Sequence, residues 1–313
     1  MNVLFHGASL TEQNASDSFY QKLIKNNNCA SIKFERYGYG SLQLDTAGFL
    51  TINHNSRLEH DICVLDWNST GLGEFDYAKL TYYIYVLLNK KIVPVFLIFK
   101  TIHNIRNRKA ERQVIELSKK LNLPLLDLRP ETDIDKHTRD KIHTNVLGAE
   151  LAAEIILEFL KKEQKNNYYK NIIKPLAQFE EVFNIDIINL KGTILNKNTI
   201  LNIENIRPSK NAELWLYLTI GPNSASIIVS TKKDEKEIEM IDQWCFYERK
   251  VFKKLPIFWE TTTDQQVMIK LSNCKPDLSK IKKPIVTVEE KYIQIHSLYV
   301  VNAKVNIRNE DRV

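Results

Sequence analysis

The stretch VLFHGASLTEQ, from Val3 to Gln13, decides how the first half of the chain is interpreted. Its first residues are apolar and β-prone, which is typical of a strand buried on both faces. Gly7 and Ala8 then interrupt the strand, and Ser9 lies in a turn before a helical segment. A strand, a turn of small residues and a helix in this order indicate the start of an α/β domain.

The same alternation continues as far as Lys165. Short β-rich runs predict strands at Val3–Phe5, Ser31–Tyr37, Ile62–Asp66, Ile92–Phe99 and Leu125–Leu128. Between them, the helical spacing of apolar residues predicts helices at Asp17–Lys25, Asp76–Leu88, Arg106–Leu121 and Gly148–Lys162. Strands that alternate with helices favour a three-layer α/β domain with a parallel sheet.

The second half of the chain has a different hydrophobic period. From Asp186 onward apolar residues mostly alternate with polar ones, as at Leu214, Leu216 and Leu218, and this is the period of half-buried strands. We therefore expect three parts: an α/β domain over 1–165, a connector with a docking helix over 166–185, and a C-terminal antiparallel β-sandwich (jelly-roll-like) accessory domain over 186–313.

Composition and charge exclude several classes of protein. Of the 313 residues, 43% are hydrophobic and 26% charged, which excludes a disordered or fibrous chain. The 44 Lys and Arg against 38 Asp and Glu give a formal net charge of only +6. The densest basic run, 106–112, contains no aromatic residue that could stack on bases. We therefore expect no nucleic-acid partner.

The sequence also carries signals about location. It starts without the basic segment and apolar core of a signal peptide. The longest apolar run, Ile92–Phe99, is far shorter than the roughly 20 residues that span a bilayer. Cys29, Cys63, Cys245 and Cys274 are too widely separated for a zinc pattern or a dense disulfide framework. We expect a cytoplasmic protein with free thiols, no metal and no membrane span.

Residues able to do chemistry follow the expected strands. Ser9 comes after the first strand, Gly40 after the second and Asn68 after the third. Asp140 and His143 precede the last helix of the first domain, three residues apart. In an open parallel sheet, ligands bind at the carboxyl ends of the strands. All four blocks are therefore expected at one edge of the sheet.

These four blocks resemble those of the SGNH, or GDSL-type, hydrolase family, named for a serine, a glycine, an asparagine and a histidine. The matching segments are Gly7–Leu10, Gly40, Asn68 and Asp140-x-x-His143, in the family's order. The resemblance extends over residues 1–163. It implies a three-layer, flavodoxin-like SGNH hydrolase domain.

Two positions depart from the family pattern. Ala8 stands where the nucleophile block has an aspartate, and Asp66-Trp67-Asn68-Ser69 replaces the pattern Gly-x-Asn-Asp. The named catalytic positions survive both changes. The departures bear on the hydrogen-bond network that supports the oxyanion loop, and therefore on the efficiency of the site.

The resemblance implies serine esterase chemistry, which the residue types also support. Ser9 is the expected nucleophile, His143 its base, and Asp140 the carboxylate that fixes the tautomer of the imidazole. The expected oxyanion-hole donors are the backbone N–H groups of Ser9 and Gly40 and the side-chain amide of Asn68. This chemistry requires no metal and no organic cofactor.

Several residues keep two interpretations. Tyr39 and Trp67 flank the expected oxyanion donors, and they either bind substrate or close the core beneath the site. Ser9 with Glu12 also matches a helix capping box. His6 either lines the site or is structural. The aromatic residues of the second half, above all in 242–249, form either a sugar-stacking platform or core.

Three functions remain open on the sequence. The first is an esterase that removes a short acyl group, with acetyl the expected one, from a carbohydrate or related polar metabolite. The second is an O-acyltransferase that passes the acyl group from Ser9 to a sugar. The third is a non-catalytic binding protein on the same fold. The expected partner is a small-molecule or glycan ester, and the oligomeric state is open.

Overall fold

The computed structural model describes residues 1–28, 31–40, 42–52, 59–67, 73–102, 109–166, 183–206, 208–209, 212–257, 266–274, 277–285 and 290–303. The chain divides into two compact units, Met1–Glu181 and Val182–Val313. Most of the expected connector, 167–182, lies outside the described residues. The finer boundaries at 165 and 185 therefore stay predictions.

The first unit is built on a five-stranded parallel sheet with the strand order β2-β1-β3-β4-β5. The strands are β1 (Asn2–Gly7), β2 (Lys33–Gly38), β3 (Ile62–Leu65), β4 (Val93–Ile98) and β5 (Leu125–Asp127). This is the flavodoxin-like order, in which the chain changes direction across the sheet between β1 and β3. The sequence-based prediction of a parallel α/β domain is confirmed.

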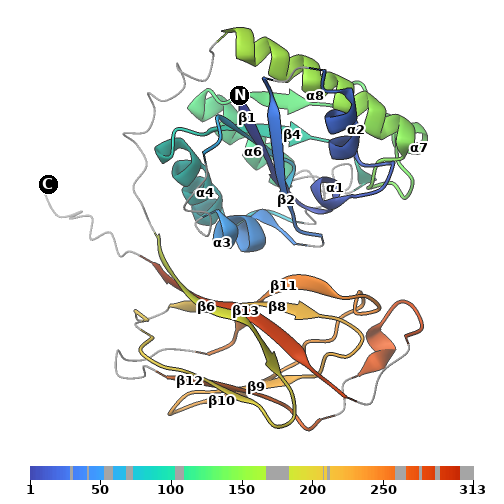
Figure 1. Ribbon diagram of the computed structural model, residues 1–313. Helices are drawn as coiled ribbons and strands as arrows, with labels where there is room; N and C mark the ends of the chain where they lie inside the picture. Colours follow the sequence, from blue (N-terminus) through green and yellow to red (C-terminus); the bar gives the residue numbers. More distant parts are fainter. Residues whose placement is uncertain are drawn as a thin grey trace, which may run out of the picture. The chain divides into compact units, whose positions relative to one another are not determined.

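Helices pack on both faces of this sheet (Figure 1). They are α1 (Ser9–Glu12), α2 (Phe19–Asn26), α3 (Phe49–Thr51), α4 (Tyr77–Asn89), α6 (Lys109–Leu121), α7 (Ile134–His137) and α8 (Val146–Asn166), with a π-helical turn η1 (Leu44–Gly48) before α3. Helices α2 and α8 pack against each other, and α3 lies next to α4. Amphipathic spacing explains α6, which buries Val114, Leu117 and Leu121 on one side.

Two central strands of the sheet, β3 and β4, are buried along their length. All four residues of β3 and all six of β4 are buried, as near-continuous apolar runs in a parallel sheet require. The short helices α3 and α7 and the turn η1 were not expected, and for α1 the sequence offered only the capping-box match of Ser9 and Glu12. Each is five residues or fewer, too short to show a helical period in the sequence.

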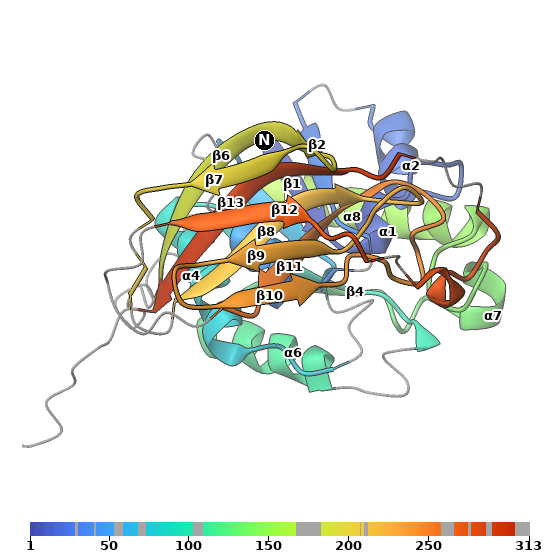
Figure 2. The ribbon, with the colours of Figure 1, turned by 90° about the horizontal axis from the view of Figure 1, so that it is seen from below.

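The second unit contains two antiparallel sheets of four strands each. The first has the order β10-β9-β12-β7 and the second β11-β8-β13-β6. The strands are β6 (Phe183–Leu195), β7 (Ile200–Ile203), β8 (Glu213–Ile220), β9 (Ile227–Ser230), β10 (Glu235–Ile238), β11 (Arg249–Leu255), β12 (Val267–Leu271) and β13 (Ile293–Ala303), with a 3₁₀ turn η5 (Leu278–Lys280). Figure 2 shows β7, β12, β9 and β10 crossing the view in that order.

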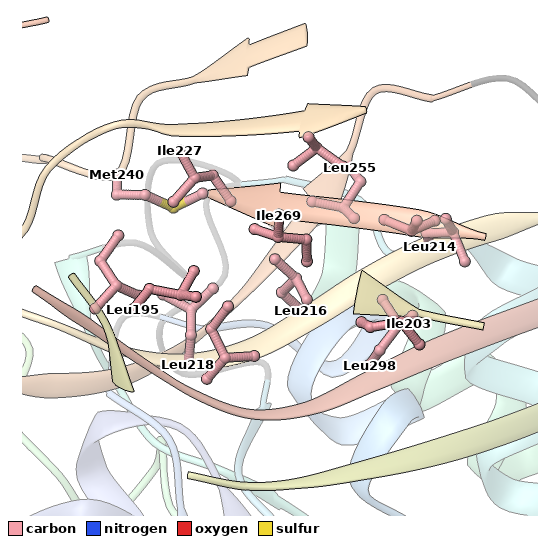
Figure 3. Close-up of a cluster of buried hydrophobic side chains, with 14 of the residues drawn as sticks. Leu195, Ile203, Leu214, Leu216, Leu218, Ile227, Met240, Leu255, Ile269 and Leu298 are labelled. Atoms are coloured by element: carbon pink, nitrogen blue, oxygen red, sulfur yellow. The ribbon is translucent and has the colours of Figure 1, made fainter. Parts of the chain in front are cut away.

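One hydrophobic cluster takes side chains from both of these sheets. Leu214, Leu216 and Leu218 of β8 belong to it, together with Ile227 of β9 and Ile269 of β12. These side chains point toward one another in Figure 3. The period-two pattern of β8 thus marks its buried face, and the prediction of antiparallel strands in this half is confirmed.

No helix among the described residues is long and apolar enough to cross a membrane.

Candidate active site

The nucleophile block forms the link between β1 and α1. Strand β1 ends at Gly7, Ala8 is the N-cap, and Ser9 is the first residue of α1. No side chain caps this helix from the N-cap position. Ser9 therefore does not act as the cap of a capping box with Glu12, and its hydroxyl is engaged elsewhere.

The histidine block forms a tight loop between α7 and α8. Thr138 and Thr144 pair as an isolated antiparallel bridge. Between them, the Asp140 Oδ1 accepts hydrogen bonds from the backbone N–H groups of Ile142 (3.1 Å) and His143 (2.8 Å). Lys141 adopts a left-handed φ of 67°, uncommon for a residue other than glycine. The loop conformation thus brings the carboxylate of Asp140 within hydrogen-bond distance of the His143 backbone and side chain.

Ser9, His143 and Asp140 form one hydrogen-bonded chain. The Ser9 Oγ lies 2.8 Å from the His143 Nε2, and the His143 Nδ1 lies 2.7 Å from the Asp140 Oδ2. Because a carboxylate can only accept, the Nδ1 carries the proton and the Nε2 is free to accept the proton of the serine hydroxyl. The structure thus brings Ser9 together with two residues that follow it by more than 130 positions in the sequence.

The charge of Asp140 suits this geometry. Partial burial acts to raise the pKa of its carboxyl, but hydrogen bonds from the His143 backbone and side chain outweigh burial and lower the pKa. The carboxyl is therefore ionised at neutral pH. A negative charge on Asp140 stabilises an imidazolium on His143, so the arrangement can accept a proton from Ser9.

Further hydrogen bonds tie the nucleophile segment to the histidine loop. The Thr144 hydroxyl donates to the backbone oxygen of Asp17 (2.6 Å), and the Gln13 side-chain amide donates to the Thr144 carbonyl (3.4 Å). An ion pair joins Arg139 to Asp17 at 2.6 Å. These contacts fix the separation between the two segments, so the Ser9–His143 distance does not rest on one hydrogen bond.

The expected oxyanion donors are only partly described. Gly40 lies in the turn after β2, and the Tyr39 N–H donates to the Gly7 carbonyl at 2.9 Å, which holds this turn beside the end of β1. Asn68 lies outside the described residues. The roles of both as donors stay predictions.

Tyr39 and Trp67 form an aromatic stack below the site. Their ring centroids are 6.2 Å apart with an interplanar angle of 15°. Trp67 is only 1% exposed and packs closely on Gly48. Of its two interpretations, the described structure matches the one in which Trp67 closes the core, whereas Tyr39 is partly exposed.

His6 is buried beside the stack of Tyr39 and Trp67. Its ring packs edge-on against Trp67, with centroids 5.1 Å apart. The Thr51 hydroxyl donates to the Ala47 carbonyl, so its oxygen accepts from the His6 Nε2 (3.0 Å), and the Nδ1 accepts from the Tyr83 hydroxyl (2.6 Å). Burial lowers the pKa of His6 to about 3. His6 is therefore a neutral structural residue.

Asp66 is the residue near the site that sequence analysis missed. Its side chain is fully buried, and its carboxylate accepts hydrogen bonds from the backbone N–H groups of Ala8 (2.8 Å) and Thr11 (3.0 Å). Burial raises its pKa to about 6, and hydrogen bonds from Thr11 and Ala8 oppose this shift. A carboxylate at the end of a wholly apolar strand was the available signal, since a buried charge needs hydrogen-bond partners.

The two remaining described histidines of the first unit have structural partners. His60 pairs with Glu35 at 2.8 Å, and the His137 Nδ1 accepts the backbone N–H of Asp133 at 2.8 Å. Among the described residues no group of three or more His, Cys, Asp or Glu side chains could hold a metal ion. His54 and His103 lie outside the described residues.

The aromatic residues of the second unit divide between core and surface. Trp215 is buried, whereas Tyr247 is 44% exposed. Phe246 packs against both Trp244 and Tyr247, with ring centroids 6.2 and 5.0 Å away. Trp259 lies outside the described residues. The stretch 242–249 thus contributes a partly exposed aromatic cluster.

Comparison with known proteins gives matches to solved structures only. No protein-family model matches the chain, and no curated protein does. The psychrotrophic esterase EstA from Pseudoalteromonas sp. is 14% identical with a TM-score of 0.44, and the match covers 53% of this chain and 99% of EstA. The acetyl xylan esterase AlAXEase is 18% identical with a TM-score of 0.40, and the match covers 50% of this chain and 98% of that enzyme.

A third matching structure comes from Desulfitobacterium hafniense DCB-2 and is described as a lipolytic protein of the G-D-S-L family. It is 14% identical with a TM-score of 0.40, and the match covers 50% of this chain and 97% of that protein. These structures match about half of this chain.

Proposed function

We propose that the protein is a serine ester hydrolase of the SGNH type, with Ser9 as nucleophile, His143 as general base and Asp140 as its carboxylate partner. The single observation that carries the proposal is the chain of hydrogen bonds from the Ser9 Oγ to the His143 Nε2 (2.8 Å) and from the Nδ1 to Asp140 (2.7 Å). A serine that merely caps a helix does not need an imidazole oriented by a carboxylate.

The reaction proceeds in two steps. In the first, the Ser9 Oγ attacks the acyl carbon while its proton passes to the His143 Nε2, and the ester bond breaks as His143 returns this proton to the leaving alcohol. In the second, His143 takes a proton from water, which attacks the acyl-enzyme. The carboxylic acid leaves, and the proton on His143 returns to the Ser9 oxygen.

Stabilisation of the tetrahedral intermediates is assigned to three donors. They are the backbone N–H of Ser9, the backbone N–H of Gly40 and the side-chain amide of Asn68. A fixed donor aimed at the developing oxyanion is worth about 10²–10³ in rate. The turn contact between Tyr39 and Gly7 supports the position of the Gly40 segment.

For the substrate, we propose a short acyl ester, with acetyl the expected group, on a carbohydrate or related polar metabolite in the cytoplasm. The second unit, proposed to be a jelly-roll-like β-sandwich, would serve as accessory domain. The 44% exposed ring of Tyr247 supports a sugar partner, because aromatic rings offer apolar faces with polar edges.

The test is hydrolysis of an activated acetyl ester by the full chain. Ser9→Ala and His143→Ala are each expected to abolish turnover while circular dichroism and the melting temperature stay close to those of the wild type. His137→Ala is the matched control, since this histidine lies near the same loop and its Nδ1 accepts the backbone N–H of Asp133. Persistent turnover by Ser9→Ala would end the nucleophile assignment.

Transfer to a sugar is the competing outcome of the same acyl-enzyme. To separate hydrolysis from transfer, glycan acceptors are added to the reaction, and the amount of free acetate is compared with the amount of acetylated glycan. Hydrolysis predicts that the acyl group goes to water at every acceptor concentration.

A further inference from the structure

Helix α1, which carries Ser9, is too short to fix its own direction. It has four residues, and an isolated helix of this length is unstable in water. Its first three N–H groups have no partner within the helix. The direction of the Ser9 side chain must therefore be imposed by contacts from outside α1.

The Asp66 carboxylate supplies such contacts at the start of α1. Its Oδ1 accepts the Ala8 N–H at 2.8 Å and its Oδ2 the Thr11 N–H at 3.0 Å, so the two bonds bracket Ser9. The carboxyl group is fully buried. Because each oxygen holds a different peptide group, the carboxylate defines an orientation and not only a position.

Gly7 provides the space for this contact. A Cβ atom at Gly7 would lie 1.4 Å from the Asp66 Oδ1, well inside van der Waals distance. The two residues lie at the ends of adjacent strands, since Gly7 is the last residue of β1 and Asp66 follows β3. At position 8, where the family motif has its aspartate, this chain has an alanine whose N–H points at Asp66.

A second contact holds the other end of the helix. The Arg36 guanidinium donates to the carbonyl oxygens of Thr11 and Gln13, at and just beyond the last turn, and its cationic centre lies 4.7 Å from the centre of the Tyr20 ring. Arg36 comes from β2 and Asp66 from the end of β3. The helix is thus held between neighbours of β1 on both sides.

We propose that Asp66 is a positioning residue for the nucleophile: its two backbone hydrogen bonds aim the Ser9 hydroxyl at His143. This inference rests on the proposed function. Asp66 contacts neither reacting atom, and acts through α1. Asparagine at this place keeps the shape but offers one acceptor, so its NH₂ group would face one of the two N–H donors and the first turn of α1 would have to move.

The test compares Asp66→Asn with Asp61→Asn in the full chain. Asp61 is the matched control, because it lies at the other end of β3 and also accepts a backbone N–H. Its Oδ2 accepts that of Asn2, in β1, at 2.7 Å. Labelling of Ser9 by a fluorophosphonate is measured over a range of concentrations and pH, and backbone hydrogen exchange is measured by mass spectrometry.

Asp66→Asn is expected to lower the maximal labelling rate by about 10²-fold, the effect of a displacement near 1 Å. The fluorophosphonate concentration at half-maximal rate should stay that of the wild type, because Asp66 contacts neither reacting atom. The pH dependence of labelling should lose the contribution of Asp66, whose own pKa is about 6. Exchange should increase in peptides covering 7–13 and stay unchanged in those covering 138–145. Asp61→Asn should label at the wild-type rate.

The outcomes separate this inference from the proposed function. Wild-type protein that does not react at Ser9 would overturn both. Reaction at Ser9 with equal rates in Asp66→Asn and wild type would overturn only the positioning role. Should Asp66→Asn not fold, the wild type itself decides: slow exchange of the Thr11 amide is expected, since the Asp66 Oδ2 accepts this N–H, and fast exchange contradicts the inference.

Discussion

Replacing Asp66 by asparagine also separates the charge of this buried carboxyl from its shape, and so predicts how stability depends on pH. Burial raises the pKa of Asp66 from 3.8 to about 6. A carboxyl with a raised pKa binds its proton more tightly in the folded state than in the unfolded state. Below the unfolded pKa the carboxyl is protonated in both states and ionisation costs no stability. As pH rises from the unfolded to the folded pKa, the free energy of unfolding falls, and it stays lowered above the folded pKa.

The size of the cost follows from the shift. One pKa unit corresponds to about 1.4 kcal/mol, so a rise from 3.8 to about 6 makes the ionised carboxyl cost about 3 kcal/mol at neutral pH. Asparagine carries no charge, so the variant does not have this free-energy cost. The free energy of unfolding of Asp66→Asn, relative to wild type, should therefore rise by about 3 kcal/mol between about pH 3 and pH 7.

The assay is urea unfolding of both full chains over this pH range, analysed as the difference between variant and wild type. Taking the difference removes the other carboxyls, such as Asp127 and Asp242, whose pKa values are lowered and act in the opposite direction. The hydrogen bond lost in the variant shifts the whole difference curve by a constant. Parallel curves, with no change of the difference across pH, would refute the reasoning.

Three further predictions concern the site and its surroundings. Asp140→Asn should lower kcat by about 10⁴-fold with little loss of stability, because the amide forces His143 into the wrong tautomer; steady-state kinetics and thermal melts measure both. His6→Asn should leave the pH midpoint of activity unchanged, because His6 is already neutral with a pKa of about 3; a pH–rate profile decides. Gly38→Ala should destabilise the first unit, since the added Cβ would lie 2.4 Å from the Glu12 backbone; calorimetry measures the loss.

Much of the first unit could be predicted because its strands have strong local signals. The apolar runs at 62–66 and 92–99 identify β3 and β4 to within a residue or two. The parallel sheet then brings the carboxyl ends of the strands together, so Ser9 could be placed at the edge of the sheet from the sequence alone. The link from Ser9 to His143 followed from the block order, and the structure shows the hydrogen bond.

The supporting contacts could not be predicted, because they join backbone groups that no side-chain pattern marks. Asp66 was expected as the last residue of a strand and the first of the asparagine block, and its partners are the peptide N–H groups of Ala8 and Thr11. The left-handed conformation of Lys141 likewise arises from loop geometry. In the sequence, Ser9 and Glu12 matched a capping box, but the tertiary bond to His143 takes the hydroxyl.

The central claim, that Ser9 is an activated nucleophile, is tested most directly by mass spectrometry after incubation with a fluorophosphonate. Wild type, Ser9→Ala and His143→Ala are compared as folded proteins. The account predicts a single phosphonyl adduct on Ser9 of the wild type, none on Ser9→Ala, and a strongly slowed reaction in His143→Ala. A folded wild-type protein that forms no adduct at Ser9, or an adduct that forms equally well without His143, would contradict it.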